Sequence, residues 1–250
     1  MSNATKNATE KAFQQNFVKE LTHYKWNAPD YLDGNKQTVT VQDLINNWRR
    51  ELNRINTDQL EGVELTDSEF KQVMAKVSLI SNSYEAAKIL AIEESKGKID
   101  GIYRDDNPKI TRKQITLTIF KKAEVRGGDS SYQIAREIQT SNGNRFDIVL
   151  LINGLPLINI EQKRTDKSLD EAFGQFQRYY RDGEYTNNFM AFSQMMVVTT
   201  EIETRYFATP KSADEFNPSF VFHWSDKENK PINNWQHVIK HFLMIPMAHQ

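Results

Sequence analysis

The segment FDIVLLINGLPLINIEQK, residues 146–163, decides the fold of this chain. Two apolar runs flank a central Asn-Gly dipeptide, which is a strong signal for a two-stranded hairpin. Three charged residues, Asp147, Glu161 and Lys163, interrupt these apolar strands. A buried carboxylate or ammonium group is destabilising unless it is paired, hydrogen-bonded or bound to a metal. A hairpin that gathers two acids and a lysine therefore predicts a site for a hard cation and, with it, phosphodiester hydrolysis.

The alternation of side chains between the two faces of each strand limits how the three charged residues can meet. Glu161 and Lys163 are two residues apart, so their side chains share one face of a strand. A plain two-residue turn at the Asn-Gly dipeptide would set Asp147 opposite Ile160 and leave Glu161 on the other face. A shift of the strand pairing by one residue would instead place Asp147 on the same face as Glu161 and Lys163. We therefore expect either a three-residue type of loop with Gly154 in a left-handed bulge, or a bulge within a strand.

The order of these charged residues resembles a known nuclease signature. Asp147 followed by Glu161-Gln162-Lys163 resembles the D…(D/E)xK motif of the PD-(D/E)xK nuclease superfamily. The segment NGLPLINIEQK, followed by GQFQRYY, is similar to the N-terminal nuclease region of the restriction (motor) subunit of type I restriction-modification enzymes. The similarity is clearest from residue 115 to residue 180. One departure is Phe146, which stands where the superfamily name has a proline.

The resemblance implies a fold and a metal site. The expected fold class is α/β (α+β), with a restriction-endonuclease-like mixed β-sheet core flanked by helices. The implied catalytic residues are Asp147, Glu161 and Lys163, and the implied cofactor is Mg²⁺, with Mn²⁺ as a surrogate. Carboxylate oxygens are the ligands that Mg²⁺ prefers, so Asp147 and Glu161 are the expected metal ligands. In this family a glutamate on the first core helix often completes the site. Glu10 is the candidate for that role, with an ordinary surface glutamate as the alternative.

A second group of residues is expected to support the site or contact DNA beside it. Gln175 and Tyr179 match the QxxxY element of this nuclease branch, and their spacing of four places them on one helix face. The alternative is an ordinary half-buried polar pair. Arg164 and Arg178 follow the hairpin and are candidates for contacts with DNA phosphates.

Composition narrows the class of protein. The chain has 250 residues, a formal net charge of −1 and no cysteine, which excludes disulfides and cysteine nucleophiles. No apolar run is long enough to span a bilayer, so no membrane role and a cytoplasmic location are expected. The near-zero net charge predicts only modest intrinsic affinity for DNA. A basic cluster could nevertheless touch phosphates; its members are Arg112, Lys113, Lys121, Lys122 and Arg126.

The chain is expected to form a single endonuclease domain over residues 1–250. The nuclease core covers about residues 9–30 and 110–205, and a helical insertion covers about 38–96. Periodicity predicts the following elements: helices at 9–24, 40–52, 68–80, 84–94 and 168–180, and strands at 115–120, 132–138 and 195–200. Residues 205–250 carry no clear assignment beyond a helical pattern at 234–243.

The resemblance implies a function and partners. The favoured interpretation is a metal-dependent endonuclease domain that cuts double-stranded DNA non-specifically after ATP-driven translocation. Modification and specificity subunits are then its partners. The translocase and ATPase domains of that family are not recognisable here, because no phosphate-binding loop motif occurs, so ATP belongs to the full-length subunit. Two alternatives stay open: a stand-alone repair or junction nuclease, and a degenerate DNA-binding or docking module.

Overall fold

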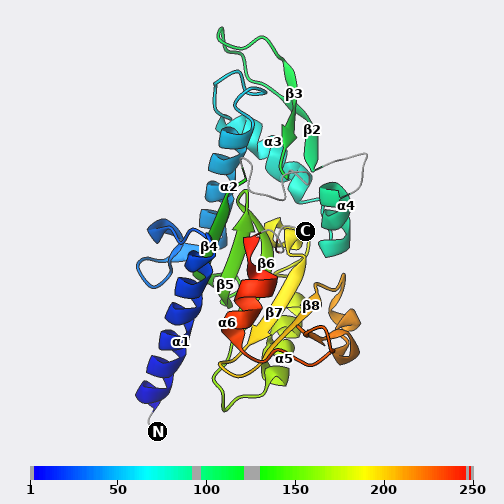
Figure 1. Cartoon of the computed structure of the whole chain (residues 1–250). Helices are drawn as coiled ribbons and strands as arrows, with labels where there is room; N and C mark the ends of the chain where they lie inside the picture. Colours follow the sequence, from blue (N-terminus) through cyan, green and yellow to red (C-terminus); the bar gives the residue numbers. More distant parts are fainter. Residues whose placement is uncertain (1–2, 92–96, 121–129, 246–247, 249–250) are drawn as a thin grey trace.

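The structure, a computed structural model, describes residues 3–91, 97–120, 130–245 and 248, with side chains from residue 10 onward. Within these residues a mixed sheet of seven strands forms the centre of the molecule (Figure 1). Its strands, in spatial order, are β1 (Val39–Thr40), β4 (Tyr132–Gln139), β5 (Arg145–Ile152), β6 (Leu155–Gln162), β7 (Met195–Thr199), β8 (Thr204–Ala208) and β9 (Phe222–His223).

The centre of this sheet explains the apolar sequence of the hairpin. β4, β5 and β6 pair antiparallel, whereas β6 and β7 run parallel and are connected through helix α5 (Leu169–Arg181). β5 and β6 are buried along almost their whole length. Strands buried on both faces read as nearly continuous apolar runs rather than as alternating ones. The mixed sheet with flanking helices is the expected restriction-endonuclease-like α/β architecture.

The β5–β6 hairpin contains the expected register shift. A two-residue turn pairs Ile152 with Leu155, as a plain hairpin would. The register then changes between Leu150 and Leu151, so that farther along Ile148 pairs with Ile160. Continued by one residue, this register sets Asp147 opposite Glu161. The second of the two expected solutions, a bulge within a strand, is therefore confirmed.

The location of the bulge has a local cause. Leu151 pairs with Pro156 and Leu150 pairs with Ile158, which leaves Leu157 as the extra residue on β6. Proline has no backbone N–H to give to a strand ladder, so within sheets it is found at edges, at strand beginnings and at bulges. Pro156 therefore interrupts the pairing where the hairpin needs one additional residue.

The turn of the hairpin docks on helix α2 (Val41–Ile55). Asn153 and Gly154 have positive φ angles of 50° and 77°, the backbone that a two-residue turn of this kind requires. A Cβ atom on Gly154 would lie 2.8 Å from the Cα atom of Trp48. The Asn153 side chain is fully buried and accepts a hydrogen bond from the Ser131 backbone N–H at 2.9 Å. The turn thus anchors the hairpin in the core.

Helices cover both faces of the sheet. The remaining helices are α1 (Asn3–His23), α3 (Asp67–Val77), α4 (Ser83–Ala91) and α6 (Trp235–Val238), which continues as a π-helical turn at Ile239–Leu243. In Figure 1, α6 crosses in front of β6 and β7, and α5 lies behind them. The expected end of α4 near residue 94 lies outside the described residues. No helix among the described residues has the length and apolar character needed to cross a bilayer.

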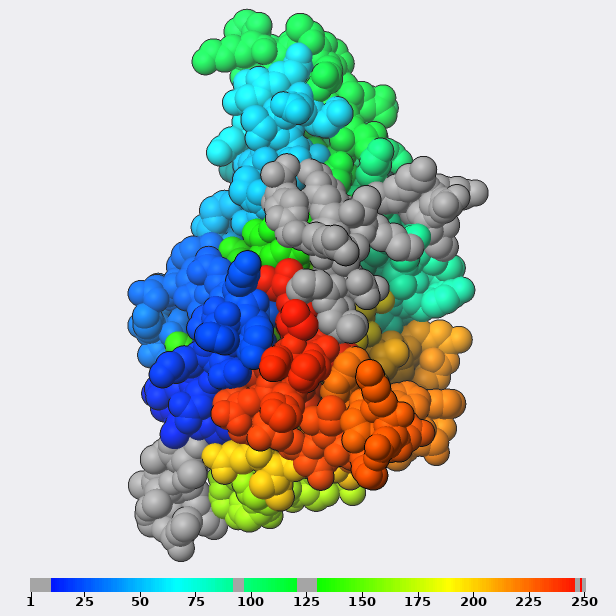
Figure 2. Space-filling view, in the orientation of Figure 1, coloured from blue at the N-terminus to red at the C-terminus, as the bar shows by residue number. Residues whose placement is uncertain are grey.

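The C-terminal segment, which had no clear assignment beyond a helical pattern, packs against α1. The rings of Phe17 and Trp235 stack with centroids 5.7 Å apart, and the Trp26 indole N–H donates to the Leu243 carbonyl at 2.7 Å. Figure 2 shows this segment, in orange and red, lying against α1 on the face presented there. Residues beyond 205 therefore complete the core.

The strand expected at residues 115–120 lies elsewhere than expected. It is β3 (Gln114–Thr118), which pairs with β2 (Lys98–Tyr103) in a separate two-stranded sheet rather than in the main sheet. This small sheet projects away from the main sheet beside α3 (Figure 1). A buried ion pair between Arg104 and Glu69, at 2.9 Å, joins it to α3. The pairing partner was missed because β2 contains a glycine and carries little apolar alternation.

Candidate active site

The register shift brings the two hairpin carboxylates together. Asp147 and Glu161 are 6% and 1% exposed, and their side chains are in hydrogen-bonding contact. The Gln162 backbone N–H donates to Asp147 Oδ2 at 2.8 Å. Two buried carboxylates in contact cannot both hold their charge without compensation, because each desolvates and repels the other. The pair therefore needs a bound cation or a proton to offset its negative charge.

The pKa values of both acids reflect this requirement. Burial raises the pKa of Asp147 to about 6, against the partly opposing effect of Lys163. Burial, followed by the charge of Asp147, raises the pKa of Glu161 well above its usual range. Strongly perturbed carboxyl groups in a cleft are characteristic of functional sites.

Lys163 completes the expected trio. Its Nζ atom lies 2.6 Å from Glu161 Oε1. Burial alone would lower the pKa of Lys163, but the adjacent Glu161 carboxylate outweighs burial and the pKa is raised. The ammonium group therefore stays charged beside the two acids and can interact with an incoming anion.

The two residues of the QxxxY element hold the site from α5. The Gln175 side-chain amide donates hydrogen bonds to both Glu161 Oε1 and the Tyr179 hydroxyl. The Tyr179 hydroxyl in turn donates to the Arg145 backbone carbonyl at 2.7 Å. Burial, then the Glu161 charge, raises the pKa of Tyr179, so its hydroxyl remains a donor. These contacts fix α5 to the beginning of β5 and orient Glu161.

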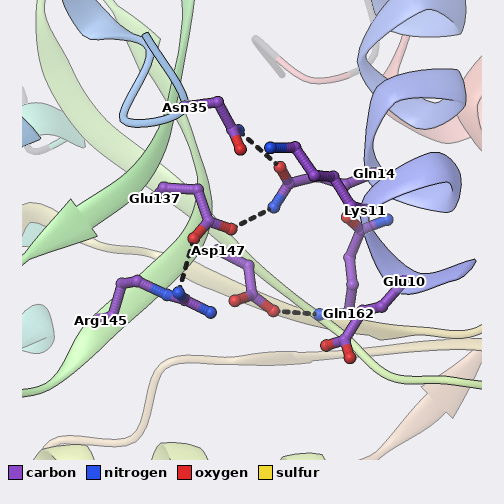
Figure 3. Close-up of a pocket in the computed structure, with 8 residues that line it drawn as sticks. All are labelled: Glu10, Lys11, Gln14, Asn35, Glu137, Arg145, Asp147 and Gln162. Atoms are coloured by element: carbon purple, nitrogen blue, oxygen red, sulfur yellow. Dashed lines mark hydrogen bonds and ion pairs between the residues drawn. The ribbon is translucent and has the colours of Figure 1, made fainter. Parts of the chain in front are cut away.

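A cavity of about 320 Å³ opens beside Asp147, between α1 and the sheet. Figure 3 shows the residues that line it: Glu10, Lys11, Gln14, Asn35, Glu137, Arg145, Asp147 and Gln162. The Glu10 carboxylate lies on the same side of the cavity as Asp147 and Gln162 in this view. The first helix therefore contributes Glu10, Lys11 and Gln14 to the wall of this cavity.

The donor set suits a hard divalent ion. Mg²⁺ is commonly held by one or two carboxylates, with water and substrate phosphate completing its shell. Asp147 and Glu161 supply such a pair. Within the described residues no three acidic or histidine side chains converge closely enough to hold an ion together. Glu10 thus lines the cavity without completing a three-carboxylate group, and its role as a ligand stays a prediction.

The arginines expected to contact DNA lie outside this cavity. Arg164 forms an ion pair with Asp166 in the loop after β6. The Arg178 guanidinium lies over the Tyr179 ring, 5.4 Å from its centroid.

The basic cluster around residue 112 lies partly outside the described residues. Arg112 donates to the Asp58 carbonyl and Lys113 pairs with Asp106, both in the region of the small sheet. The other three members, Lys121, Lys122 and Arg126, lie outside the described residues.

Glu137 and Arg145 are among the cavity residues that were not foreseen from the sequence. Glu137 on β4 accepts a hydrogen bond from Gln14 Nε2 at 2.6 Å, and its Oε2 atom lies 2.8 Å from Arg145 Nη1. Arg145 could have been identified from the sequence, because it lies two residues before Asp147 and so on the same face of β5. For Glu137 no local pattern distinguished it from an ordinary strand glutamate.

The raised pKa of Asp147 leads to a prediction about stability. A carboxyl group whose pKa is about 6 in the folded protein, above the ordinary 3.8, favours folding when protonated. Its contribution is complete below about pH 3.8 and is lost as the pH rises through about 6. Without metal, Asp147→Asn is therefore expected to be more stable than the wild type by on the order of 2 kcal/mol near pH 7, and this difference should vanish near pH 4.

Urea unfolding in a chelating buffer at several pH values measures this difference. Asp166→Asn is the matched control, because Asp166 is exposed and its substitution should leave stability nearly unchanged at every pH. A pH-independent difference for Asp147→Asn would contradict the assignment of a destabilising buried charge.

Comparison with known proteins identifies a family that matches most of the chain. Residues 7–215 match the family described as "Type I restriction enzyme R protein N terminus". A type I restriction enzyme endonuclease subunit of Staphylococcus aureus (strain COL), SauCOLORF180P, is 34% identical over 212 residues, which are 83% of this chain and 21% of that protein. The Escherichia coli EcoprrI endonuclease subunit is 25% identical over 227 residues, covering 81% of this chain and 66% of that protein. The chain spans about a fifth of the length of its staphylococcal relatives.

Proposed function

Because the chain belongs to the family of N-terminal regions of type I restriction enzyme R proteins, we propose that it is the endonuclease domain of such an enzyme and hydrolyses phosphodiester bonds of double-stranded DNA. The observation that carries this proposal is the convergence of Asp147, Glu161 and Lys163 in one buried site. A degenerate docking module would have no need for two desolvated carboxylates in contact. A stand-alone repair nuclease is less favoured because the family match covers most of the chain.

The proposed cofactor is Mg²⁺, which would be held by Asp147 and Glu161. When bound, it would polarise the scissile phosphate and lower the pKa of a water molecule. Lys163, 2.6 Å from Glu161, presents a positive charge where it can stabilise the charge that develops on the phosphate. Gln175 keeps Glu161 oriented, and Tyr179 holds α5 to the beginning of β5. These contacts preorganise the site before DNA arrives.

The remaining features of the proposal concern the whole enzyme. Following the family resemblance, we place cleavage after ATP-driven translocation by motor domains of a longer subunit. Its partners would be the modification and specificity subunits, and its location the cytoplasm, where the DNA is. The modest net charge of this chain, −1, supports delivery of the DNA by partners rather than by strong intrinsic binding.

Calorimetric titration of Mn²⁺ into the metal-free protein tests the proposed metal site. The wild type is expected to bind and to release protons, because the perturbed carboxyl groups must ionise to coordinate an ion. Glu161→Ala is expected to abolish binding, and Asp166→Ala, an exposed control, should leave it unchanged. Equal binding by wild type and Glu161→Ala would exclude Glu161 as a ligand.

A further inference from the structure

The cavity beside Asp147 presents an electrostatic problem for a DNA-cleaving site. Three carboxylates line it, those of Glu10, Glu137 and Asp147, and Glu161 is in contact with Asp147. The DNA backbone is a polyanion, so these groups repel it. The two cations among the lining residues are Lys11 and Arg145. Of these two, Arg145 is held in place by an ion pair with Glu137, another residue of the cavity wall.

Arg145 is placed beside the catalytic carboxylate by the strand itself. It is the first residue of β5 and shares a face with Asp147, two residues further on. Both residues line the same cavity. The Arg145 side chain is 57% exposed, so its guanidinium group lies at the rim of the cavity and remains accessible. Figure 3 shows it joined to Glu137, with Asp147 beside both.

The partner of Arg145 is held rigidly. The Glu137 side chain is mostly buried, and while Oε2 pairs with Arg145, Oε1 accepts from Gln14 on α1. Asn35 donates in turn to the Gln14 side-chain oxygen at 3.2 Å. Arg145 is therefore oriented through contacts with α1 and with the loop before β1, rather than by one flexible surface pair.

The backbone of Glu137 is also unusual. Its φ angle is 55°, a left-handed conformation that costs a non-glycine residue roughly 1–2 kcal/mol. The loop beside it explains how this conformation persists, because the Gly34 N–H donates to the Arg136 carbonyl and a Cβ on Gly34 would lie 2.4 Å from the Glu137 carbonyl oxygen. Backbone strain of this kind clusters at functional sites, where the surrounding structure maintains it.

We propose that Arg145 binds a phosphate of the DNA strand in the cleavage site, with Glu137 as the residue that positions its guanidinium group. This inference rests on the proposed function. A guanidinium group carries five N–H donors in a planar fork, and the pair with Glu137 engages its Nη1 end. The rest of the fork suits two oxygens of one phosphate. Arg145 also offsets the repulsion between the DNA and the carboxylates of the cavity.

DNA-binding measurements test the proposal in a protein that cannot cut. In a Glu161→Gln background, anisotropy of a short fluorescein-labelled DNA duplex gives the dissociation constant at several salt concentrations. Arg145→Ala is expected to weaken binding about tenfold and to reduce the slope of log K against log salt by about one. Arg145→Lys should keep the slope and lose part of the affinity, because it keeps the charge without the fork. Glu137→Gln should weaken binding less than Arg145→Ala while leaving thermal stability near that of the parent.

Arg205→Ala is the matched control. Arg205 also lies on a strand and pairs with a glutamate, Glu203, at 2.7 Å, but its strand is β8, three positions from β5 in the sheet. Its substitution should change affinity less than twofold. If Arg145→Ala behaves like Arg205→Ala while the parent binds DNA and the wild type cleaves it, the role of Arg145 is overturned and the proposed function stands. If the parent does not bind and the wild type does not cleave DNA, both are overturned.

Discussion

Asp147→Ala is expected to reduce DNA cleavage by about 10³-fold or more while the protein remains folded. The carboxylate is buried, lies in contact with Glu161 and has no role in the apolar core, so its loss removes a metal ligand rather than a packing group. Glu161→Ala and Lys163→Ala are expected to show losses of similar size. Plasmid cleavage with Mg²⁺, by this chain and by an assembled enzyme carrying the same substitution, measures the effect.

The fold of each variant decides how a loss of cleavage is interpreted. Removing one of two repelling carboxylates relaxes the apo site, so Asp147→Ala and Glu161→Ala should melt at or above the wild-type temperature. Asp166→Ala is the control, an acid from the loop that follows β6 that should retain full cleavage. Unfolding of all three site variants would instead indicate that Asp147, Glu161 and Lys163 form a structural ion-pair cluster.

Gly154→Ala is expected to destabilise the protein by about 3–5 kcal/mol. Two costs combine at this position. The backbone has φ +77°, which an L side chain rarely adopts, and the new Cβ would lie 2.8 Å from the backbone of Trp48 on α2. A helix backbone at a fully buried residue cannot move aside without disturbing the core. Chemical denaturation measures the loss.

Gly143→Ala separates the two costs. Gly143 lies in the turn between β4 and β5 with φ +81°, but nothing lies within 4 Å of an added Cβ. Its substitution should cost only about 1–2 kcal/mol, the strain of the left-handed backbone. Equal losses at the two glycines would show that the turn does not press on α2 and that its docking contributes little.

The segment Asn153-Gly154-Leu155-Pro156 therefore has a structural role beside the chemistry of the site. Asn and Gly form the turn and seat it on α2, and Pro156 supplies the interruption that shifts the register. Both effects are local consequences of residue type. They could be expected from the sequence because left-handed turns favour Asn and Gly, and because proline cannot donate to a strand ladder.

The candidate trio was also accessible from the sequence. Charged residues on an apolar hairpin must be compensated, and the parity of Asp147 and Glu161 required a bulge that the structure contains. The contact of Gln175 with Tyr179 follows from helical spacing. The contact of Gln175 with Glu161 does not, because it depends on how α5 packs behind the sheet.

What the sequence determined by itself were features set by residues close together in the chain: the hairpin, its bulge, the shared face of the acids and the helix that follows. What only the tertiary structure decided was the wall of the cavity. Gln14 meets Glu137 across 123 positions of sequence, and β3 pairs with β2 rather than with the core. The hydrophobic periodicity of a helix or strand predicts which of its faces is buried, but many other elements could cover that face. The choice among them is made by the packing of the whole chain, and with it the environment of Arg145 and Asp147.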